Sequence, residues 1–140
     1  MKASKEAVEK IKEFEGCRLK AYKCAGGVWT IGYGHTDGVK EGQEITMDAA
    51  NELLAMDLMD VEAEVTALGE WTQGQFDALV SFVFNLGIGQ FMHSTLYKKI
   101  KAGAPKEEIQ FQFRRWIYSG GKILPGLQIR RAWEAARYFS

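Results

Sequence analysis

Short strand-like runs separated by glycines occupy the first third of the chain. Six glycines fall between positions 26 and 42, and the runs at 18–23 and 28–33 are joined by Ala25-Gly26-Gly27. Runs this short between turn residues form a small, twisted antiparallel sheet of two or three strands. A sheet of that size is stable only when helices pack against it. The sequence therefore predicts an α+β fold that is mainly helical.

Helical patterns cover most of the remaining residues. A first helix runs from Ser4, which can cap it, to about Phe14, and Gly16 stops it. A long helix begins at Thr46 and carries an apolar stripe to about Leu68. Further helices are predicted at 72–87, where Thr72 and Gln75 form a capping box, and at 94–103, which Ser94 or Thr95 starts. Two more helices are predicted at 105–118 and 127–138, and a turn is predicted at 88–94.

Two of these helices carry predictions about individual side chains. The acidic residues of the long helix are expected to be solvated, and the last helix is expected to point Leu127, Trp133 and Ala136 inward. Arg130 and Arg131 can bind an acidic group of a substrate or form ion pairs with nearby carboxylates, and the second role is favoured. The acidic residues of the long helix are Glu52, Asp57, Asp60, Glu62 and Glu64.

A carboxyl, a thiol and a hydroxyl group lie around the junction of the first helix and the sheet. Glu15 ends the helix, where the negative end of the helix dipole favours the protonated carboxyl that a general acid needs. Cys24 and Thr30 follow it along the chain. Because side chains alternate along a strand, Thr30 points outward if Trp29 and Ile31 are buried. Position alone favours a solvated Glu15 and a buried, apolar Cys24.

His35 follows directly on these groups and can be a ligand, a base or a structural residue. The second histidine, His93, is remote in sequence, so a structural hydrogen-bonded position at the join of sheet and helix is favoured. Two cysteines without paired histidines nearby make a poor zinc site. No metal and no cofactor is expected.

The spacing of these groups resembles a known enzyme signature. Glu15 is followed after eight residues by Cys24, after five more by Thr30, and then directly by Ile-Gly-Tyr-Gly-His-Thr. This pattern is similar to the catalytic signature of the phage-type lysozymes, the endolysins of glycoside hydrolase family 24. Two further runs resemble motifs of the same family, TQGQFDALVSFVFNLG at 72–87 and RWIYSGGKILPGL at 115–127.

This resemblance covers nearly the whole chain and implies one lysozyme-like domain over 1–140 with two lobes. A small antiparallel sheet lobe at about 15–46 is joined by the long helix to a helical-bundle lobe at about 68–140, which also takes in the N-terminal helix. The implied function is that of a muramidase from a phage or prophage. Such an enzyme hydrolyses the β-1,4 bond between N-acetylmuramic acid and N-acetylglucosamine in peptidoglycan and lyses the host cell.

The resemblance also assigns the chemistry. Glu15 protonates the leaving glycosidic oxygen, and Thr30 with Cys24 holds the attacking water on the opposite face of the sugar, an arrangement that favours inversion at the anomeric carbon. Substrate-binding roles are implied for a second group of residues, of which Phe84 can equally be a core aromatic residue. That group is Thr36, Phe84, Asn85, Ser94 and Gln110.

Cys24 departs from the commonest family pattern, which has aspartate at this position. A neutral thiol is a weaker acceptor than a carboxylate, and a nearby Glu15 anion is expected to raise the pKa of Cys24. A thiolate is a strong nucleophile. The sequence therefore leaves open whether Cys24 orients water, acts as a base or acts as a nucleophile, and whether the anomeric configuration is retained or inverted.

The charge of the chain and its N-terminal sequence limit which binding partners and which location are expected. The chain has 18 basic and 18 acidic side chains, which argues against duplex DNA and means that any attraction to an anionic cell wall is local. The N-terminus is charged throughout, and no apolar run is long enough to span a membrane. We expect a monomer, made in the host cytoplasm with reduced cysteines before release to the wall, whose partner is bacterial peptidoglycan and not nucleic acid.

Two other classes of function are alternatives to that of an enzyme. A catalytically inactive peptidoglycan-binding module with a lysozyme fold is compatible with a thiol at position 24. A plain helical interaction domain requires the signature to be a coincidence, which the two further family-like runs argue against.

Overall fold

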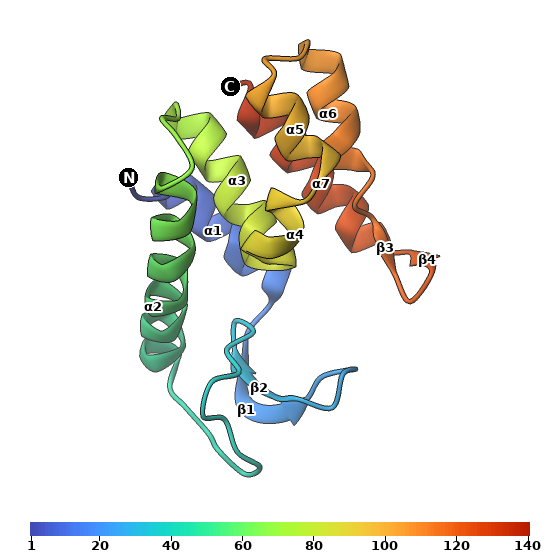
Figure 1. The fold of residues 1–140 in the computed structure, drawn as a ribbon. Coiled ribbons are helices and arrows are strands. Elements are labelled where there is room, and N and C mark those ends of the chain that lie inside the picture. Colours follow the sequence, from blue (N-terminus) through green and yellow to red (C-terminus); the bar gives the residue numbers. More distant parts are fainter. The chain divides into compact units, whose positions relative to one another are not determined.

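Seven helices and two small antiparallel sheets make up the computed structural model, which describes all residues from 1 to 140 (Figure 1). The predicted class, mainly helical α+β, is confirmed. None of the helices combines the length and the hydropathy that a bilayer-spanning segment requires. In chain order the elements are α1 (Lys5–Glu15), β1 (Arg18–Lys23), β2 (Trp29–Gly32), α2 (Met47–Thr66), α3 (Gln73–Leu86), α4 (Ile88–Met92), α5 (Thr95–Lys101), α6 (Lys106–Arg114), β3 (Tyr118–Ser119), β4 (Lys122–Ile123) and α7 (Pro125–Tyr138).

The chain forms two compact units. The small unit consists of residues 8–60 and contains the β1–β2 sheet. The large unit consists of residues 1–7 together with 61–140 and contains α3 to α7. Both boundaries fall inside helices, so α1 and α2 each contribute residues to both units. The division into lobes at about 15–46 and 68–140 stays a prediction.

The sheet of the small unit has two strands and one bridged segment. β1 and β2 pair antiparallel, with Lys23 opposite Trp29. Lys20 of β1 also forms an isolated antiparallel bridge with Glu44. The segment around Glu44 thus takes the place of a third strand, which agrees with the two or three strands expected from the glycine pattern.

His35 ties the loop after β2 to α2 within the small unit. Its Nδ1 lies 2.9 Å from Asp57 Oδ2, and its Nε2 lies 2.9 Å from the carbonyl oxygen of Asp37. The predicted structural position of His35 is confirmed, whereas the solvated role predicted for Asp57 is wrong. Glu62, in the large unit, also has a partner, because it accepts a 2.7 Å hydrogen bond from the Ala3 N–H. Helical periodicity predicts that these carboxylates lie on the polar face of the helix, but it does not predict which hydrogen-bond donor each of them contacts.

Four helices begin at the capping residues that the sequence predicts. In each case the side-chain oxygen accepts a hydrogen bond from the backbone N–H three residues further on, which satisfies a donor that the helix itself leaves unpaired. At α3 the reciprocal bond from the side chain of Gln75 completes a capping box. The four capping residues are Ser4, Thr46, Thr72 and Ser94.

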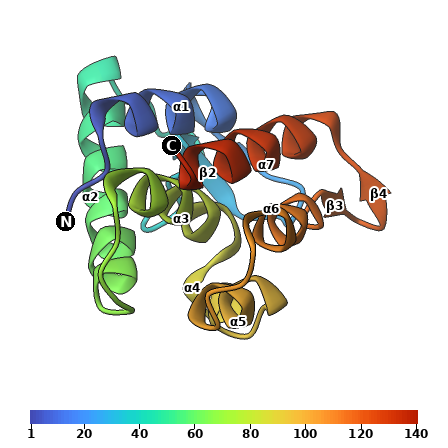
Figure 2. The ribbon, with the colours of Figure 1, turned by 90° about the horizontal axis from the view of Figure 1, so that it is seen from above.

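Helix α3 is the centre of the large unit. It is buried on nearly all sides, as its apolar sequence predicts, and packs against α7. Helix α6 lies between α7 and α5 (Figure 2). The ring of Phe82 in α3 has its centroid 5.7–5.8 Å from the ring centroids of Phe91, Phe113 and Trp116. These edge-on contacts join α3 to α4 and to the end of α6.

The turn predicted at 88–94 is wrong, because Ile88–Met92 form the short helix α4. One helical turn carries Phe91 into the core, where its side chain is fully buried against Phe82. Helices this short owe their stability to tertiary packing and not to local propensity. The local sequence, which contains Gly87 and Gly89, therefore gives no sign of it.

The helix predicted to reach Tyr118 ends four residues earlier, at Arg114. Tyr118–Ser119 instead pairs with Lys122–Ile123 as an antiparallel hairpin across Gly120 and Gly121. Both glycines have positive φ, 58° and 79°. A two-residue type I′ hairpin turn requires positive φ at both central positions. The glycine pair therefore permits a hairpin turn here, whereas the apolar periodicity alone predicts that the helix continues.

Helix α7 buries charge as well as apolar surface. Arg130, Arg131 and Glu134 are all buried in the large unit. Arg131 Nε lies 2.7 Å from Glu134 Oε1, and the Ser81 hydroxyl donates to Glu134 Oε2 at 2.6 Å. The favoured role of the two arginines, ion pairs with the protein's own carboxylate, is confirmed. Ala136 is exposed, so the inward orientation predicted for it is wrong. The buried face of α7 is the one that carries Glu134.

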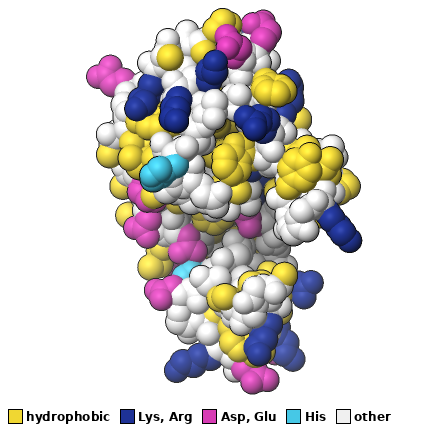
Figure 3. Space-filling view, turned by 45° about the vertical axis from the view of Figure 1, so that its right-hand side comes forward, with side chains coloured by type: hydrophobic (Ala, Val, Ile, Leu, Met, Phe, Trp, Pro, Cys, Tyr) yellow, Lys and Arg dark blue, Asp and Glu magenta, His cyan; other side chains and the backbone are white.

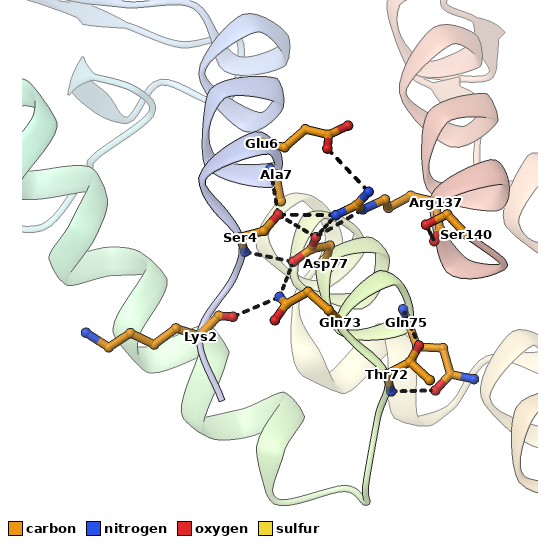
Figure 4. A network of polar contacts seen from close by, with 10 residues as sticks. All are labelled: Lys2, Ser4, Glu6, Ala7, Thr72, Gln73, Gln75, Asp77, Arg137 and Ser140. Carbon is orange, nitrogen blue, oxygen red and sulfur yellow. Dashed lines mark hydrogen bonds and ion pairs between the residues drawn. The ribbon is translucent and has the colours of Figure 1, made fainter.

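Both ends of the chain are held on α3 by a polar network around Asp77 (Figure 4). The buried carboxylate of Asp77 accepts hydrogen bonds from the Ser4 N–H at 2.9 Å and the Ser4 hydroxyl at 2.6 Å. Arg137 of α7 donates to the same carboxylate at 2.7 and 3.0 Å. A β-carbon on Gly74 would lie 2.5 Å from the carbonyl oxygen of Arg137, so glycine is required where α7 ends against α3.

Candidate active site

The end of α1 places Glu15 at the border between helix and sheet. Gly16 adopts φ of 68°, and its N–H donates to the carbonyl oxygen of Lys12 at 2.9 Å. A glycine in the left-handed region is the usual way for a helix to end. Glu15 is therefore the last residue of α1, as the sequence predicts, and its side chain is half-buried.

The carboxylate of Glu15 lies against the tight turn that follows Thr30. Ile31 and His35 exchange two backbone hydrogen bonds of 2.9 Å, which close this turn. Gly34, inside the turn, has φ of 87°, and a β-carbon on it would lie 3.3 Å from Glu15 Oε1. The Ile-Gly-Tyr-Gly-His run thus has a physical role, because glycine at position 34 leaves room for the carboxylate.

Cys24 and Thr30 contact each other in the same unit. The β1–β2 turn brings the backbone at Val28 and at Gly26 to the Cys24 sulfur, and the hydroxyl of Thr30 also reaches it. These hydrogen bonds, first from Val28, then from Gly26 and more weakly from Thr30, lower the pKa of the Cys24 thiol. The raised pKa predicted from a nearby Glu15 anion is therefore wrong in direction, because the backbone donors outweigh the one influence that raises the pKa, the partial removal of the sulfur from water. These donors are backbone groups positioned by the β1–β2 turn, so the sequence of side chains does not predict them.

Thr30 is buried, with 4% of its surface exposed, whereas the outward orientation is predicted for the case in which both Trp29 and Ile31 are buried, and Trp29 is only half-buried. Its neighbour Ile31 is fully buried, which means that β2 is covered on both faces at this point. The Thr30 hydroxyl donates to the carbonyl oxygen of Val28 at 3.0 Å. A hydroxyl has one proton and two lone pairs. The Thr30 hydroxyl can therefore direct its one proton to the Val28 carbonyl or to the Cys24 sulfur but not to both, and in either case its oxygen can still accept a hydrogen bond from a further group.

The residues with predicted substrate-binding roles fall into different surroundings. Thr36 is exposed in the small unit. In the large unit, Phe84 and Asn85 are half-buried at the end of α3. Gln110 uses its side-chain amide to donate to the carbonyl oxygen of Ala135 at 3.1 Å, and this bond joins α6 to α7.

Ser94 caps α5 and lines a pocket of about 520 Å³ in the large unit. Its hydroxyl oxygen accepts a 3.0 Å bond from the Tyr97 N–H, and the side chain is nearly fully buried. The other predicted substrate-binding residues do not line this pocket. Most of the residues that line this pocket were not predicted from the sequence. Two of them, Arg115 and Trp116, begin the family-like run at 115–127. The lining residues are Gln90, His93, Ser94, Thr95, Gln112, Arg115 and Trp116.

A metal centre is not part of this arrangement, since no group of three or more histidine, cysteine, aspartate or glutamate side chains is placed to hold an ion. The small unit instead brings together a carboxylate, a thiol and a hydroxyl around one turn. Such a set can supply and accept protons and can orient a water molecule.

Comparison with known proteins defines the class. The muramidase domain of SpmX from Asticaccaulis excentricus superposes with a TM-score of 0.90 at 38% identity, over 99% of this chain and 98% of that one. Solved phage endolysins also share the fold. The chain is therefore a hydrolase of lysozyme fold.

The sequence comparisons identify the family. The phage lysozyme family model matches residues 12–134. The endolysin of Acyrthosiphon pisum secondary endosymbiont phage 1 is 41% identical over 100% of this chain and 99% of its own length. The endolysin of Bacillus phage PZA is 40% identical over 100% of this chain, which spans 56% of that protein. The chain belongs to the phage lysozyme family.

Proposed function

We propose that this protein is an endolysin-type muramidase that hydrolyses the β-1,4 bond between N-acetylmuramic acid and N-acetylglucosamine in peptidoglycan. Membership of the phage lysozyme family supports the reaction class. The observation that carries the residue assignment is the turn shared by the three groups. Glu15 meets this turn at Gly34, and Thr30, just before it, contacts Cys24.

In the proposed reaction, Glu15 gives its proton to the glycosidic oxygen as the bond from that oxygen to the anomeric carbon breaks. Water attacks the anomeric carbon from the opposite face, and its proton passes to the Cys24 thiolate. Exchange with solvent then returns a proton to Glu15 and removes one from Cys24. The lowered pKa of Cys24 favours this role as base, because a larger fraction of the thiol is ionised at neutral pH. A water between the two groups leads to inversion.

A second function is a peptidoglycan-binding module that has lost catalysis. The observation that favours it is the thiol at position 24 together with the burial of Thr30. In this case Cys24 and Thr30 serve packing and hydrogen bonding within the β1–β2 turn, and Glu15 takes part in no chemical step.

One experiment separates the two functions. Purified peptidoglycan sacculi are incubated with the wild type and with Glu15→Gln, and released reducing ends and sedimented protein are both measured. Release that disappears in the variant identifies the enzyme. Sedimentation of both proteins without release identifies the binding module. The absence of both release and sedimentation would contradict both functions. The monomeric state and synthesis in the host cytoplasm before release stay predictions, which light scattering and fractionation of induced cells can check.

Thr30→Ala is expected to lower kcat and kcat/KM together by about tenfold, with KM little changed. The reason is that Thr30 is proposed to hold a water that matters in the transition state, and the loss of such an interaction lowers both parameters equally. Initial rates of reducing-end release from solubilised peptidoglycan provide the measurement. An effect confined to KM would instead make Thr30 a sugar-binding residue.

Gly34→Ala is expected to lower kcat by about tenfold or more, because the added methyl group lies 3.3 Å from Glu15 Oε1 and displaces the carboxylate. The matched control is Gly38→Ala. Gly38 also has positive φ, 70°, but a β-carbon there meets nothing within 4 Å. Both variants carry the same kind of backbone strain, of about 1 kcal/mol or more. Equal losses of activity in the two variants would show that strain, and not the contact with Glu15, is responsible.

A further inference from the structure

Positive charge is concentrated in one part of the large unit. Residues 95–122, which include α5, α6 and the β3–β4 hairpin, contain seven basic and two acidic side chains, hence a formal charge of +5 in a chain of zero net charge. Lysine and arginine side chains gather over α5 and α6 in the space-filling view (Figure 3). We name this region the basic surface. Its members are Lys98, Lys99, Lys101, Lys106, Arg114, Arg115 and Lys122.

Most of this charge is available to a partner. Six of the seven side chains belong to exposed residues, and only Lys99 is half-buried, where it pairs with Glu108 at 2.9 Å. Lys98, Lys101 and Lys106 form no ion pair within the protein. Lysines at positions three apart on a helix lie on the same face, so Lys98 and Lys101 point to one side of α5.

Two of the lysines are held in place by aromatic rings. Lys101 Nζ lies 4.7 Å from the ring centroid of Tyr97, and Lys106 Nζ lies 5.6 Å from that of Phe139. Cation–π contacts of this kind restrict a flexible side chain without neutralising its charge. The basic surface is thus partly ordered before any anion arrives, which lowers the entropic cost of binding one.

The charge of the small unit points away from a long polyanion as the partner. Residues 8–60 contain six basic and ten acidic side chains, a formal charge of −4. A nucleic acid requires positive charge along an extended track. A partner with short, separate carboxylate-bearing branches needs only the one local cluster, and the peptides attached to peptidoglycan glycan strands have this chemistry.

We propose that the basic surface binds the carboxylates of peptidoglycan peptides and retains the protein on the wall between cleavage events. This proposal rests on the proposed function, because it assumes that peptidoglycan is the substrate. The zero net charge removes long-range attraction, and the Debye length is about 10 Å at 0.1 M salt, so the surface acts only at close range. Retention is therefore salt-sensitive, whereas the chemical step is not.

The test compares two triple variants that remove the same charge. Lys98→Gln/Lys101→Gln/Lys106→Gln alters the basic surface. Lys2→Gln/Lys5→Gln/Lys40→Gln is the control, because these three lysines belong to exposed residues outside it. Both sets are made in the Glu15→Gln background, so that sacculi stay intact and binding is measured without hydrolysis. Co-sedimentation with sacculi at low salt is expected to weaken about tenfold in the first variant and not in the control.

Chemical treatment of the wall identifies the anion. Amidation of the sacculus carboxylates is expected to bring the parent protein down to the level of the first variant, and 0.5 M salt is expected to remove the difference between them. Removal of phosphate polymers from the wall is expected to change nothing, and vesicles of anionic phospholipid are expected not to compete. Equal binding by both triple variants, indifference to amidation, or dependence on phosphate or lipid would overturn the proposal.

Hydrolysis is measured separately, on short solubilised peptidoglycan fragments with Glu15 restored. The variant of the basic surface is expected to keep the parent kcat there, because retention on a wall is irrelevant to a soluble substrate. Absence of hydrolysis in all proteins, with carboxylate-dependent binding intact, would refute the proposed function and leave the binding surface standing. A loss of kcat in the variant would refute the binding role as stated.

Discussion

Glu15→Gln is expected to lose reducing-end release from peptidoglycan by about 10²–10⁴-fold, the range that general acid catalysis supplies. The amide has nearly the same shape as the carboxylic acid but has no acidic proton to give to the leaving oxygen. Glu15 is the half-buried last residue of α1, and the helix ends there through Gly16 and not through the carboxylate. Initial rates on solubilised peptidoglycan provide the measurement, and the thermal unfolding midpoint shows whether the fold is kept.

The matched control for this result is Glu13→Gln on the same helix. Glu13 is exposed and pairs only with Lys10, at 3.2 Å, so its loss is expected to leave activity and the unfolding midpoint nearly unchanged. Full activity in a folded Glu15→Gln protein would remove Glu15 from the mechanism. A fall of the same size in both variants would show that the helix is sensitive to charge in general.

Cys24→Ala is expected to lower kcat by about 10²-fold, whereas Cys24→Asp keeps turnover at the wild-type level or above it. The reason is that alanine removes the group proposed to take the proton from water, and aspartate restores an acceptor that is ionised at neutral pH. Hydrogen bonds from the backbone at Val28 and Gly26 lower the pKa of the thiol and can serve a carboxylate equally well. Reducing-end release by the three proteins provides the comparison.

The same residue is expected to make the wild type sensitive to mild peroxide. A thiolate is the form that oxidises to sulfenic and higher acids, and the lowered pKa of Cys24 increases its amount. Cys24→Asp is expected to be resistant, and Cys17→Ala is expected to stay active and as sensitive as the wild type. Wall clearing by Cys24→Ala at the wild-type rate, with no effect of peroxide on any protein, would mean that Cys24 is a packing residue.

The features predicted correctly are those in which neighbours along the chain interact. The helix caps at Ser4, Thr46, Thr72 and Ser94 act over three residues, so a side chain and its position suffice to predict them. The end of α1 at Glu15 and the β1–β2 pairing are equally local. The candidate carboxyl, thiol and hydroxyl groups could be named because their spacing along the chain carries the family signature.

The features that were missed depend on contacts between distant residues or on the backbone. Helix α4 exists because Phe91 packs against Phe82, and its local sequence favours a turn. The burial of Thr30 depends on what covers both faces of β2, and the pairing of Asp57 depends on a histidine 22 residues earlier. The direction of the Cys24 pKa depends on backbone donors whose position a list of residue types does not contain.

The Asp77 network has a consequence for the nascent chain. Residues 1–7 belong to the large unit, so the small unit interrupts it in sequence. During translation, residues 8–60 leave the ribosome before residues 61–140, so the contacts within the small unit can form first. The N-terminal arm, by contrast, waits for Asp77, and the Asp77 carboxylate waits in turn for Arg137 near the end of α7. The large unit therefore closes only after α7 has left the ribosome, and a truncated chain lacking α7 leaves the Asp77 carboxylate without its arginine.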